Sequence, residues 1–240
     1  MKQTNAYIFM YASVMVIVVA AILSFASESL KPIQENNVKI EKIQNILSSV
    51  NIESTTDNAS EIFDKYIPET KRLAIGFDGN IKNGISAFDI NLKKEFAKEK
   101  NEQSYPLFIC KLDNGEEKMI IPILGKGLWG PIWGYVAMNM DYNTIYGAVF
   151  DHKGETPGLG ADINKDWFEK PFSGKTIFDK DGNFVSITVH KGGKGSAERA
   201  GDTEHGVDAI SGGTITSKGL EDMVKDNLQN YVNYFKNNKN

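Results

Sequence analysis

The stretch YPLFICKLDNGEEKMIIPIL, residues 105–124, decides the fold class. Two apolar runs, 105–111 and 118–124, flank Asp113-Asn114-Gly115, and such a turn between strand-like runs indicates a β-hairpin. Hairpin-linked strands with helices mainly at the ends favour an α+β domain with a mixed, largely antiparallel sheet over a doubly wound parallel sheet. Further strands are predicted at residues 73–77, 85–90, 132–139, 144–150, 175–178 and 183–190.

Amphipathic helices are expected on both sides of these strands. Apolar residues recur at three- and four-residue spacing over 220–235, which predicts one C-terminal helix with Thr216 or Ser217 as its N-cap. The same spacing over 38–50 predicts a helix before the sheet, and the polar run 54–60 predicts a loop.

The N-terminal segment is apolar and long enough to span a bilayer. No charged residue occurs from Gln3 to Ser27, and the apolar run is longer than the core of a typical signal peptide. A cleaved signal is the alternative, because small residues at Ser24 and Ala26 fit a peptidase site. Lys2 biases the N-terminus toward the cytoplasm. The predicted organisation is a transmembrane anchor at 1–30, an amphipathic helix and linker at 31–60, and a globular domain at 61–240.

Composition excludes several classes of protein. The 240 residues are 41% hydrophobic and 24% charged with a net charge of −4, so the chain can bury a core and lacks the basic stripe of a nucleic-acid-binding protein. Cys110 is the sole cysteine, which excludes an internal disulfide and predicts a buried structural thiol within its apolar run. The three histidines lack metal-ligand spacing.

Three short motifs give only weak evidence for a nucleotide-binding or catalytic site. Residues 125–130 match the G-x-G-x-x-G fingerprint, but Pro131 and a strand-like run follow where a dinucleotide site needs a helix. Residues 173–176 resemble the end of a Walker A loop, but Glu169 replaces its first glycine. Ser211 lacks the G-x-S-x-G frame of a hydrolase nucleophile, although spacing alone leaves a triad open.

The run Asp208–Thr214, DAISGGT, places a hydroxyl on a small-residue turn just before the C-terminal helix. A phosphate held by Thr214 would meet the unpaired N–H groups and the positive dipole end of that helix. Gly212 and Gly213 let the backbone approach closely. Alone, this pattern is also ordinary turn and cap chemistry.

Two other runs accompany it in order: GLWGPIWGYVA at 127–137 and HKGETPGLG at 152–160. Together with the apolar N-terminal segment, they resemble the C subunits of the bacterial sodium-translocating NADH:quinone oxidoreductases, within the covalent FMN-binding domain family. The resemblance covers essentially the whole chain and implies that the FMN phosphate is esterified to Thr214. Ala209 stands where the family pattern usually has glycine, and Gly213 where it usually has alanine.

The resemblance also implies the composition of the flavin site. Glu155 and Thr156 would supply polar contacts, Leu159 would cover a face of the isoalloxazine ring, and Trp129 offers a flat surface to the flavin or to a neighbouring subunit. No catalytic or metal-binding residue is expected. The expected cofactor-binding residues are Thr214, Ser211, Gly212, Gly213, Asp208, Glu155, Thr156, Gly158, Leu159 and Trp129.

The function implied is electron transport within a membrane redox pump. FMN on this chain would relay electrons between other membrane subunits, a flavin transferase would install it, and the chain alone would not oxidise NADH. The domain would lie on the periplasmic side of the bacterial inner membrane. The alternatives are the equivalent flavin subunit of the ferredoxin-linked, Rnf-type complex and a non-enzymatic, membrane-anchored binding module of the envelope.

Overall fold

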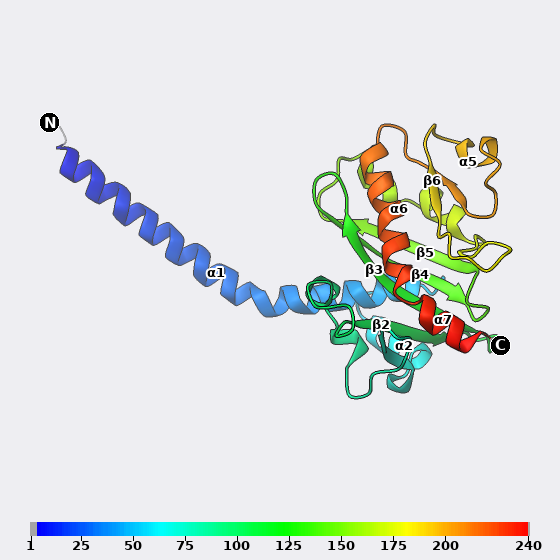
Figure 1. Ribbon diagram of the computed structural model, residues 1–240. Coiled ribbons are helices and arrows are strands. Elements are labelled where there is room, and N and C mark those ends of the chain that lie inside the picture. Colours follow the sequence, from blue (N-terminus) through cyan, green and yellow to red (C-terminus); the bar gives the residue numbers. More distant parts are fainter. Residues whose placement is uncertain (1–3, 240) are drawn as a thin grey trace. The chain divides into compact units, whose positions relative to one another are not determined.

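The structure, a computed structural model, describes residues 4–239, and the chain divides into two compact units, residues 1–42 and 43–240 (Figure 1). Helix α1 (Asn5–Ser48) supplies residues 5–42 of the first unit, and its last six residues, 43–48, belong to the second unit. Within the described residues, α1 is the one helix long and apolar enough to cross a membrane, and apolar side chains such as Phe9 and Phe25 are exposed along it. The helix runs through Pro32, so the expected anchor and the expected amphipathic helix form one element.

A five-stranded antiparallel sheet forms the centre of the second unit. Its order is β1-β2-β3-β4-β5, so every neighbour in the sheet is also the neighbour in sequence, which confirms the α+β class. The hairpin predicted at 113–115 joins β2 to β3, with Gly115 at φ 84°. The strands are β1 (Arg72–Gly76), β2 (Ser104–Lys111), β3 (Glu117–Lys126), β4 (Pro131–Asn139) and β5 (Ile145–His152).

A second, parallel pair of strands lies outside this sheet: β6 (Thr188–His190) and β7 (Gly206–Asp208). The sequence predicted longer strands at 175–178 and 183–190, and there the structure has isolated bridges and the short β6. The strand predicted at 85–90 is wrong, because residues 87–89 form the 3-10 turn η2. These segments have strand-like composition, but turns divide them before a ladder can form.

Short helices connect and cover the strands. Part of the loop predicted at 54–60 is the start of a helix, α2. The elements are η1 (Glu69–Lys71), η2 (Ala87–Asp89), η3 (Gly160–Asn164), η4 (Lys170–Phe172), α2 (Ala59–Tyr66), α3 (Leu92–Glu95), α4 (Asp166–Glu169), α5 (Ser196–Arg199), α6 (Thr214–Gln229) and α7 (Val232–Asn238).

The single C-terminal helix predicted at 220–235 is two helices, α6 and α7, with a break at 230–231. Tyr231 explains the break: it is 1% exposed, and its hydroxyl donates to the Pro106 carbonyl at 2.7 Å. The chain leaves the helical path to bury this ring with its hydrogen bond satisfied.

Helix α6 packs against β3 and crosses one face of the sheet (Figure 1). Asn227 fixes this packing, because its side-chain amide accepts from the Leu124 N–H at 3.2 Å and donates to the Leu124 carbonyl at 3.0 Å. Gly219 allows the close approach, since a Cβ there would clash with the Lys126 carbonyl. The start of α6 is thereby held beside the end of β3.

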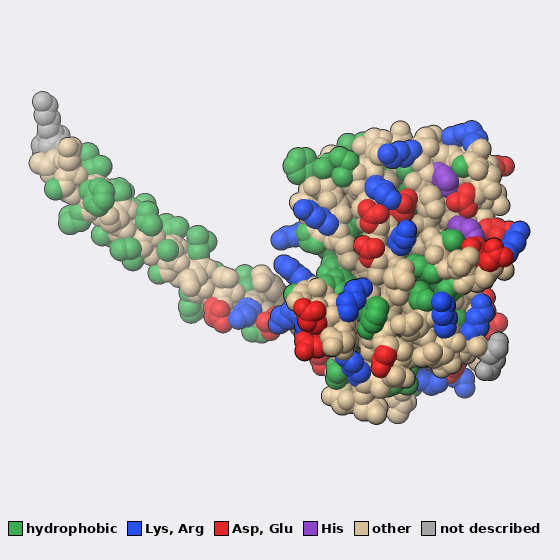
Figure 2. Space-filling model, viewed as in Figure 1, with side chains coloured by type: hydrophobic (Ala, Val, Ile, Leu, Met, Phe, Trp, Pro, Cys, Tyr) green, Lys and Arg blue, Asp and Glu red, His purple; other side chains and the backbone are tan. Residues whose placement is uncertain are grey.

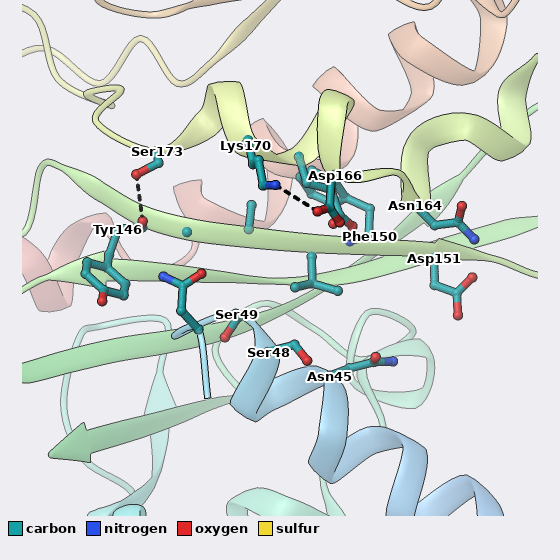
Figure 3. A pocket seen from close by; sticks show the side chains of 15 residues that line it. Asn45, Ser48, Ser49, Tyr146, Phe150, Asp151, Asn164, Asp166, Lys170 and Ser173 are labelled. Atoms are coloured by element: carbon teal, nitrogen blue, oxygen red, sulfur yellow. Dashed lines mark hydrogen bonds and ion pairs between the residues drawn. The ribbon is translucent and has the colours of Figure 1, made fainter. Parts of the chain in front are cut away.

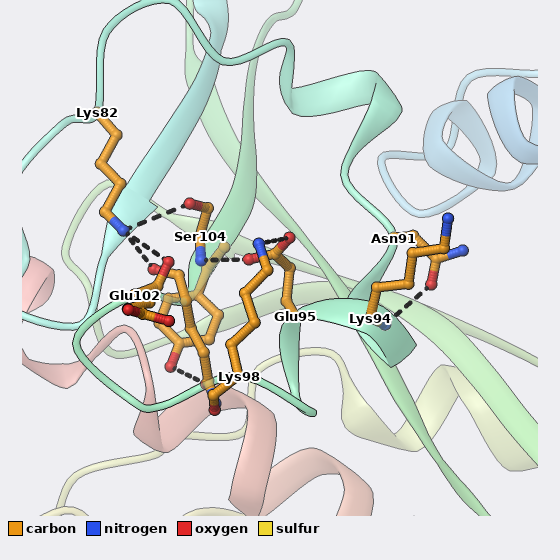
Figure 4. A network of polar contacts seen from close by, with 9 residues as sticks. Lys82, Asn91, Lys94, Glu95, Lys98, Glu102 and Ser104 are labelled. Atoms are coloured by element: carbon orange, nitrogen blue, oxygen red, sulfur yellow. Dashed lines mark hydrogen bonds and ion pairs between the residues drawn. The ribbon is translucent and has the colours of Figure 1, made fainter.

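The loop before β2 is fixed by a network around a buried carboxylate (Figure 4). Glu95 accepts from the Ser104 N–H at 2.9 Å and from the Lys98 ammonium at 2.7 Å. Lys82 donates to the carbonyls of Glu102 and Gln103.

Cys110 lies in β2 and is buried, as predicted. Burial raises the pKa of its thiol to about 12, so it stays protonated and inert.

Candidate functional site

The predicted attachment turn connects β7 to α6. Residues 209–213 follow β7, and α6 begins at Thr214, whose side chain is exposed. Gly212 has φ +76°, in the left-handed region, and a Cβ there would lie 2.7 Å from Leu159 Cδ2. The turn therefore needs glycine at 212 for its backbone angle and for its contact with the 152–160 loop.

The N-cap of α6 is Gly213, which makes no side-chain cap hydrogen bond, so the predicted cap role of Thr216 or Ser217 is wrong. Both residues lie inside the first turns, with their hydroxyls turned to other partners. Ser217 Oγ accepts from the Ile210 N–H at 3.1 Å, and Thr216 Oγ1 donates to Glu155 Oε2 at 2.6 Å. The first N–H groups of α6, without a side-chain acceptor from the cap, can meet an anion.

Glu155 is 5% exposed and joins three segments. Its Oε1 accepts from the Trp129 N–H at 2.9 Å, its Oε2 accepts from Thr216, and its own N–H donates to His152 Nδ1 at 3.2 Å. Burial acts to raise the pKa of this carboxyl, but the Thr216 hydroxyl and the N–H groups of residues 128–130 outweigh it, so the pKa is lowered. Glu155 is therefore ionised at neutral pH.

Glycines pack directly against this carboxylate. A Cβ on Gly127 would lie 2.6 Å from Oε1, and one on Gly160 would lie 2.6 Å from Oε2. A Cβ on Gly213 would lie 3.2 Å from the Gly160 nitrogen. The turn between β3 and β4, residues 127–130, is the β3–β4 tip. This tip, the 152–160 loop and the attachment turn thus interlock through positions that a larger residue would disrupt.

Large apolar side chains are exposed around this junction. Trp129 is 69% exposed, Ile215 is 61% exposed, and Leu128 and Leu159 are also exposed. Figure 2 shows apolar side chains gathered at the end of the domain that holds the β3–β4 tip and the start of α6. Thr156 and Gly158 are exposed in the same loop, and the Gly158 N–H donates to Asp162 at 3.1 Å.

Asp208 organises the glycine-rich segment before the turn. Its carboxylate accepts from the N–H groups of Gly195 at 2.5 Å and Ala197 at 2.9 Å, and from Ser196 Oγ at 3.0 Å. Burial opposes the ionised form, but these hydrogen bonds prevail and lower the pKa of Asp208. Asp208 also lines a cavity of about 490 Å³ together with Trp167, Phe168, Pro171, Lys194 and Ala209. An aromatic face and a lysine beside the attachment turn fit a flat, anionic cofactor.

A second cavity, of about 560 Å³, contains none of the sequence-predicted site residues (Figure 3). Polar side chains from the end of α1 and from β5 and α4 line it, among them Ser48, Asp151 and Asp166. Burial is the main cause that raises the pKa of Glu169 in its wall to about 7, although the Phe150 N–H donates to this carboxylate at 2.7 Å.

The residues of the weak motifs form turns and hydrogen bonds within the fold. Residues 127–130 form the turn between β3 and β4, and a strand follows, as predicted. His190 Nε2 lies 2.8 Å from Asp202 Oδ2, and His205 Nδ1 lies 2.6 Å from the Thr176 carbonyl oxygen. These contacts give one ring nitrogen of each of these two histidines a partner other than Ser211.

Sequence reasoning did not find the link between Thr216 and Glu155. The spacing of Thr214 and Thr216 could have predicted that only one of them points inward, since residues two apart on a helix face different directions. Thr216 is 1% exposed, whereas Thr214 is exposed.

Comparisons with known proteins agree with this geometry. Residues 127–229, which include the runs 127–137, 152–160 and 208–214, match the model of the FMN-binding domain family. The chain is 31% identical over 222 residues to the C subunit of the Na(+)-translocating NADH-quinone reductase of Haemophilus ducreyi, covering 87% of this chain and 84% of that protein. It is 34% identical over 219 residues to the corresponding protein of Neisseria meningitidis serogroup A, covering 85% and 82%.

Two solved structures are similar as well. The C subunit of the Na(+)-translocating NADH-quinone reductase of Parabacteroides distasonis aligns with a TM-score of 0.74 and 37% identity, covering 86% of this chain and 96% of that chain. Shewanella oneidensis NqrC aligns with a TM-score of 0.69 and 30% identity, covering 85% and 99%.

Proposed function

Because this chain belongs to the family of C subunits of the Na(+)-translocating NADH-quinone reductases, we propose that it relays electrons through FMN held covalently on Thr214. Family membership makes it a subunit of a multisubunit reductase with an FMN-binding domain. We propose in addition the attachment residue, the ester linkage and the extent of that domain, residues 61–240. Membership also favours this complex over the ferredoxin-linked one.

One observation carries the choice of Thr214. Of the three hydroxyls in the first turns of α6, those of Thr216 and Ser217 are engaged within the protein, whereas Thr214 is exposed on the first helical residue. A phosphate on Thr214 would be met by the N–H groups of a helix whose cap, Gly213, supplies no side-chain acceptor. The residues therefore fit a phosphate ester at this position.

The attachment step exchanges one bond for another. A bond forms between Thr214 Oγ and the flavin phosphorus, and the bond from that phosphorus to the nucleotide of an activated flavin dinucleotide breaks. The hydroxyl proton goes to a base of the flavin transferase, and the nucleotide leaves. A phosphate linked to Thr214 would retain one negative charge, which the start of α6 would stabilise by about 0.3–1 kcal/mol.

Bound FMN supplies reversible electron transfer. The chain positions it: Thr214 keeps it at a high local concentration without a dissociation equilibrium. The exposed Trp129, Leu159 and Ile215 offer apolar contact beside the tether. Ser211, Gly212 and Gly213 form the turn, and Thr156 and Gly158 belong to the loop that faces it. Electron transfer between subunits needs an open, partner-facing site of this kind.

Helix α1 suggests a single-pass membrane anchor, as expected for a subunit of a membrane complex. The proposed topology places the FMN-binding domain on the periplasmic side of the inner membrane, in keeping with the charge bias at Lys2. A reporter enzyme fused after Asn240 is expected to be active only outside the cytoplasm. Activity of the same fusion in the cytoplasm would contradict this topology.

The test of the attachment is intact mass after denaturation, with the full chain expressed beside a flavin transferase. The wild-type chain is expected to carry the mass of one FMN less one water, and Thr214→Ala to carry none. Ser211→Ala is the control, because it removes an exposed hydroxyl of the same turn and is expected to keep the flavin. Flavin that leaves the wild-type chain on denaturation, or that stays on Thr214→Ala, would contradict the proposal.

A further inference from the structure

The carboxylate of Glu155 ties the β3–β4 tip, the 152–160 loop and the start of α6 together through hydrogen bonds. It accepts from Trp129 in the first segment and from Thr216 in the third, at 2.9 Å and 2.6 Å. Glu155 and Thr216 are 5% and 1% exposed, so water does not compete for these bonds.

The bond to Thr216 also sets the direction of Thr214. Residues advance about 100° per position around an α-helix, so these two side chains point about 200° apart on the first turn of α6. With Thr216 drawn inward to the carboxylate, Thr214 is turned out to solvent, and the structure has one hydroxyl buried and the other exposed.

The hydrogen-bond donors around Glu155 indicate that this residue serves to position the segments it joins. The groups that lower its pKa are a hydroxyl and the N–H groups of residues 128–130, which are all neutral. A buried carboxylate without a cationic partner is an expensive way to stabilise a fold, and an apolar side chain would fill the space at less cost. A fixed set of hydrogen bonds to this carboxylate, in contrast, holds separate segments in one geometry.

We propose that Glu155 is a positioning residue for flavin attachment, which acts through Thr216 and Trp129 to fix the first turn of α6 and present the Thr214 hydroxyl to the flavin transferase. The proposal rests on the attachment to Thr214 proposed above. It gives Glu155 a role through the protein, distinct from direct contact with the cofactor.

The test measures the rate of attachment on the full chain in detergent, with purified transferase and a flavin dinucleotide as donor, by intact mass over time. Glu155→Gln keeps the size of the side chain and loses its charge, and Thr216→Val keeps the shape and loses the donor. Thr216→Ser restores the donor. Glu95→Gln is the matched control, because Glu95 is also buried and also accepts a backbone N–H, at Ser104.

Glu155→Gln and Thr216→Val are expected to slow attachment at least about tenfold, since a misplaced reacting group loses rate steeply. Thr216→Ser and Glu95→Gln are expected to remain within about threefold of the wild-type rate. Hydrogen exchange of the hydrogen-bonded amides in the first turns of α6, beginning with Ser217, is expected to quicken in Thr216→Val and to recover in Thr216→Ser.

Three results would overturn the inference: wild-type rates in both slow variants, no rescue by Thr216→Ser, or an equal loss in Glu95→Gln. If Glu155→Gln does not fold, Thr216→Val and its rescue decide the matter. A wild-type chain that takes up no covalent flavin would contradict the proposed function itself, whereas normal labelling of all variants would contradict this inference alone.

Discussion

Two buried glutamates, Glu155 and Glu95, fix loops beside the same sheet by different means. Glu95 has a lysine three residues away, Lys98, and a backbone N–H at the start of β2 (Figure 4). Glu155 is held by a hydroxyl and backbone N–H groups from the β3–β4 tip and α6. A carboxylate neutralised by a lysine three residues away closes a loop, whereas one held by a hydroxyl and backbone N–H groups of distant segments defines how those segments meet.

The largest expected difference in stability separates these two residues. Glu155→Ala leaves the buried Thr216 hydroxyl and the partly buried Trp129 N–H without an acceptor, and is expected to lower the free energy of unfolding by about 2–4 kcal/mol. Glu95→Ala is expected to cost about 1–2 kcal/mol, because the half-exposed Lys98 can return to water. Denaturant unfolding of both variants measures the difference, and a larger loss in Glu95→Ala would break the comparison.

The next largest expected difference is in the stability lost when each of two threonines of α6, Thr216 and Thr214, is replaced. Thr216→Val is expected to cost about 1–2 kcal/mol of unfolding free energy, since it leaves a buried, charged acceptor without its shortest hydrogen bond. Thr214→Ala removes an exposed hydroxyl and is expected to change stability by at most about 0.5 kcal/mol. Thermal unfolding of the flavin-free proteins measures both, and equal losses would contradict the inward and outward directions assigned to these side chains.

A third carboxylate, that of the partly buried Glu169, has too few hydrogen-bond donors to offset its burial. Burial, aided by Asp166 and Asp151, raises its pKa from 4.5 to about 7 against the single N–H of Phe150. Because the folded pKa is the higher one, its contribution to stability is present below about pH 4.5 and is lost as pH rises through 7.

Glu169→Gln is therefore expected to raise the free energy of unfolding at pH 8 by on the order of 1 kcal/mol, reduced from the full shift because the group is only partly buried. It is also expected to flatten the pH dependence between 4.5 and 7. Glu61→Gln is the control, since Glu61 is exposed on α2 and is not among the groups that shift the pKa of Glu169. A wild-type slope that persists in Glu169→Gln would contradict the shift.

The part of the sheet from β2 to β5 was predictable from sequence because its pairings are local. Turn residues at 113–115 and strand-like runs on either side define the β2–β3 hairpin, and short turns join β3 to β4 and β4 to β5. The parallel pair β6–β7 was not predictable, since 15 residues separate the three-residue strands. Neither was the break before Tyr231, which depends on a hydrogen bond to Pro106 far along the chain.

In the candidate site too, features made by residues close together in sequence were predictable, and contacts between distant residues were not. The glycines and hydroxyls of the attachment turn are contiguous in sequence, so their shared location was predictable. The contact between Glu155 and Thr216 joins residues 61 positions apart and exists only because α6 packs beside the end of β3. The same packing replaced the predicted cap role of Thr216 with a buried hydrogen bond.

The most direct test of the central proposal is peptide mapping of the flavin on the unmutated chain, matured by a flavin transferase and digested with a protease. Fragment masses are expected to place one FMN, less water, on Thr214, with Ser211, Thr216 and Ser217 unmodified. Flavin on Thr216 or Ser217 would contradict both the attachment residue and the inward direction of these hydroxyls, and a flavin-free digest would contradict covalent attachment.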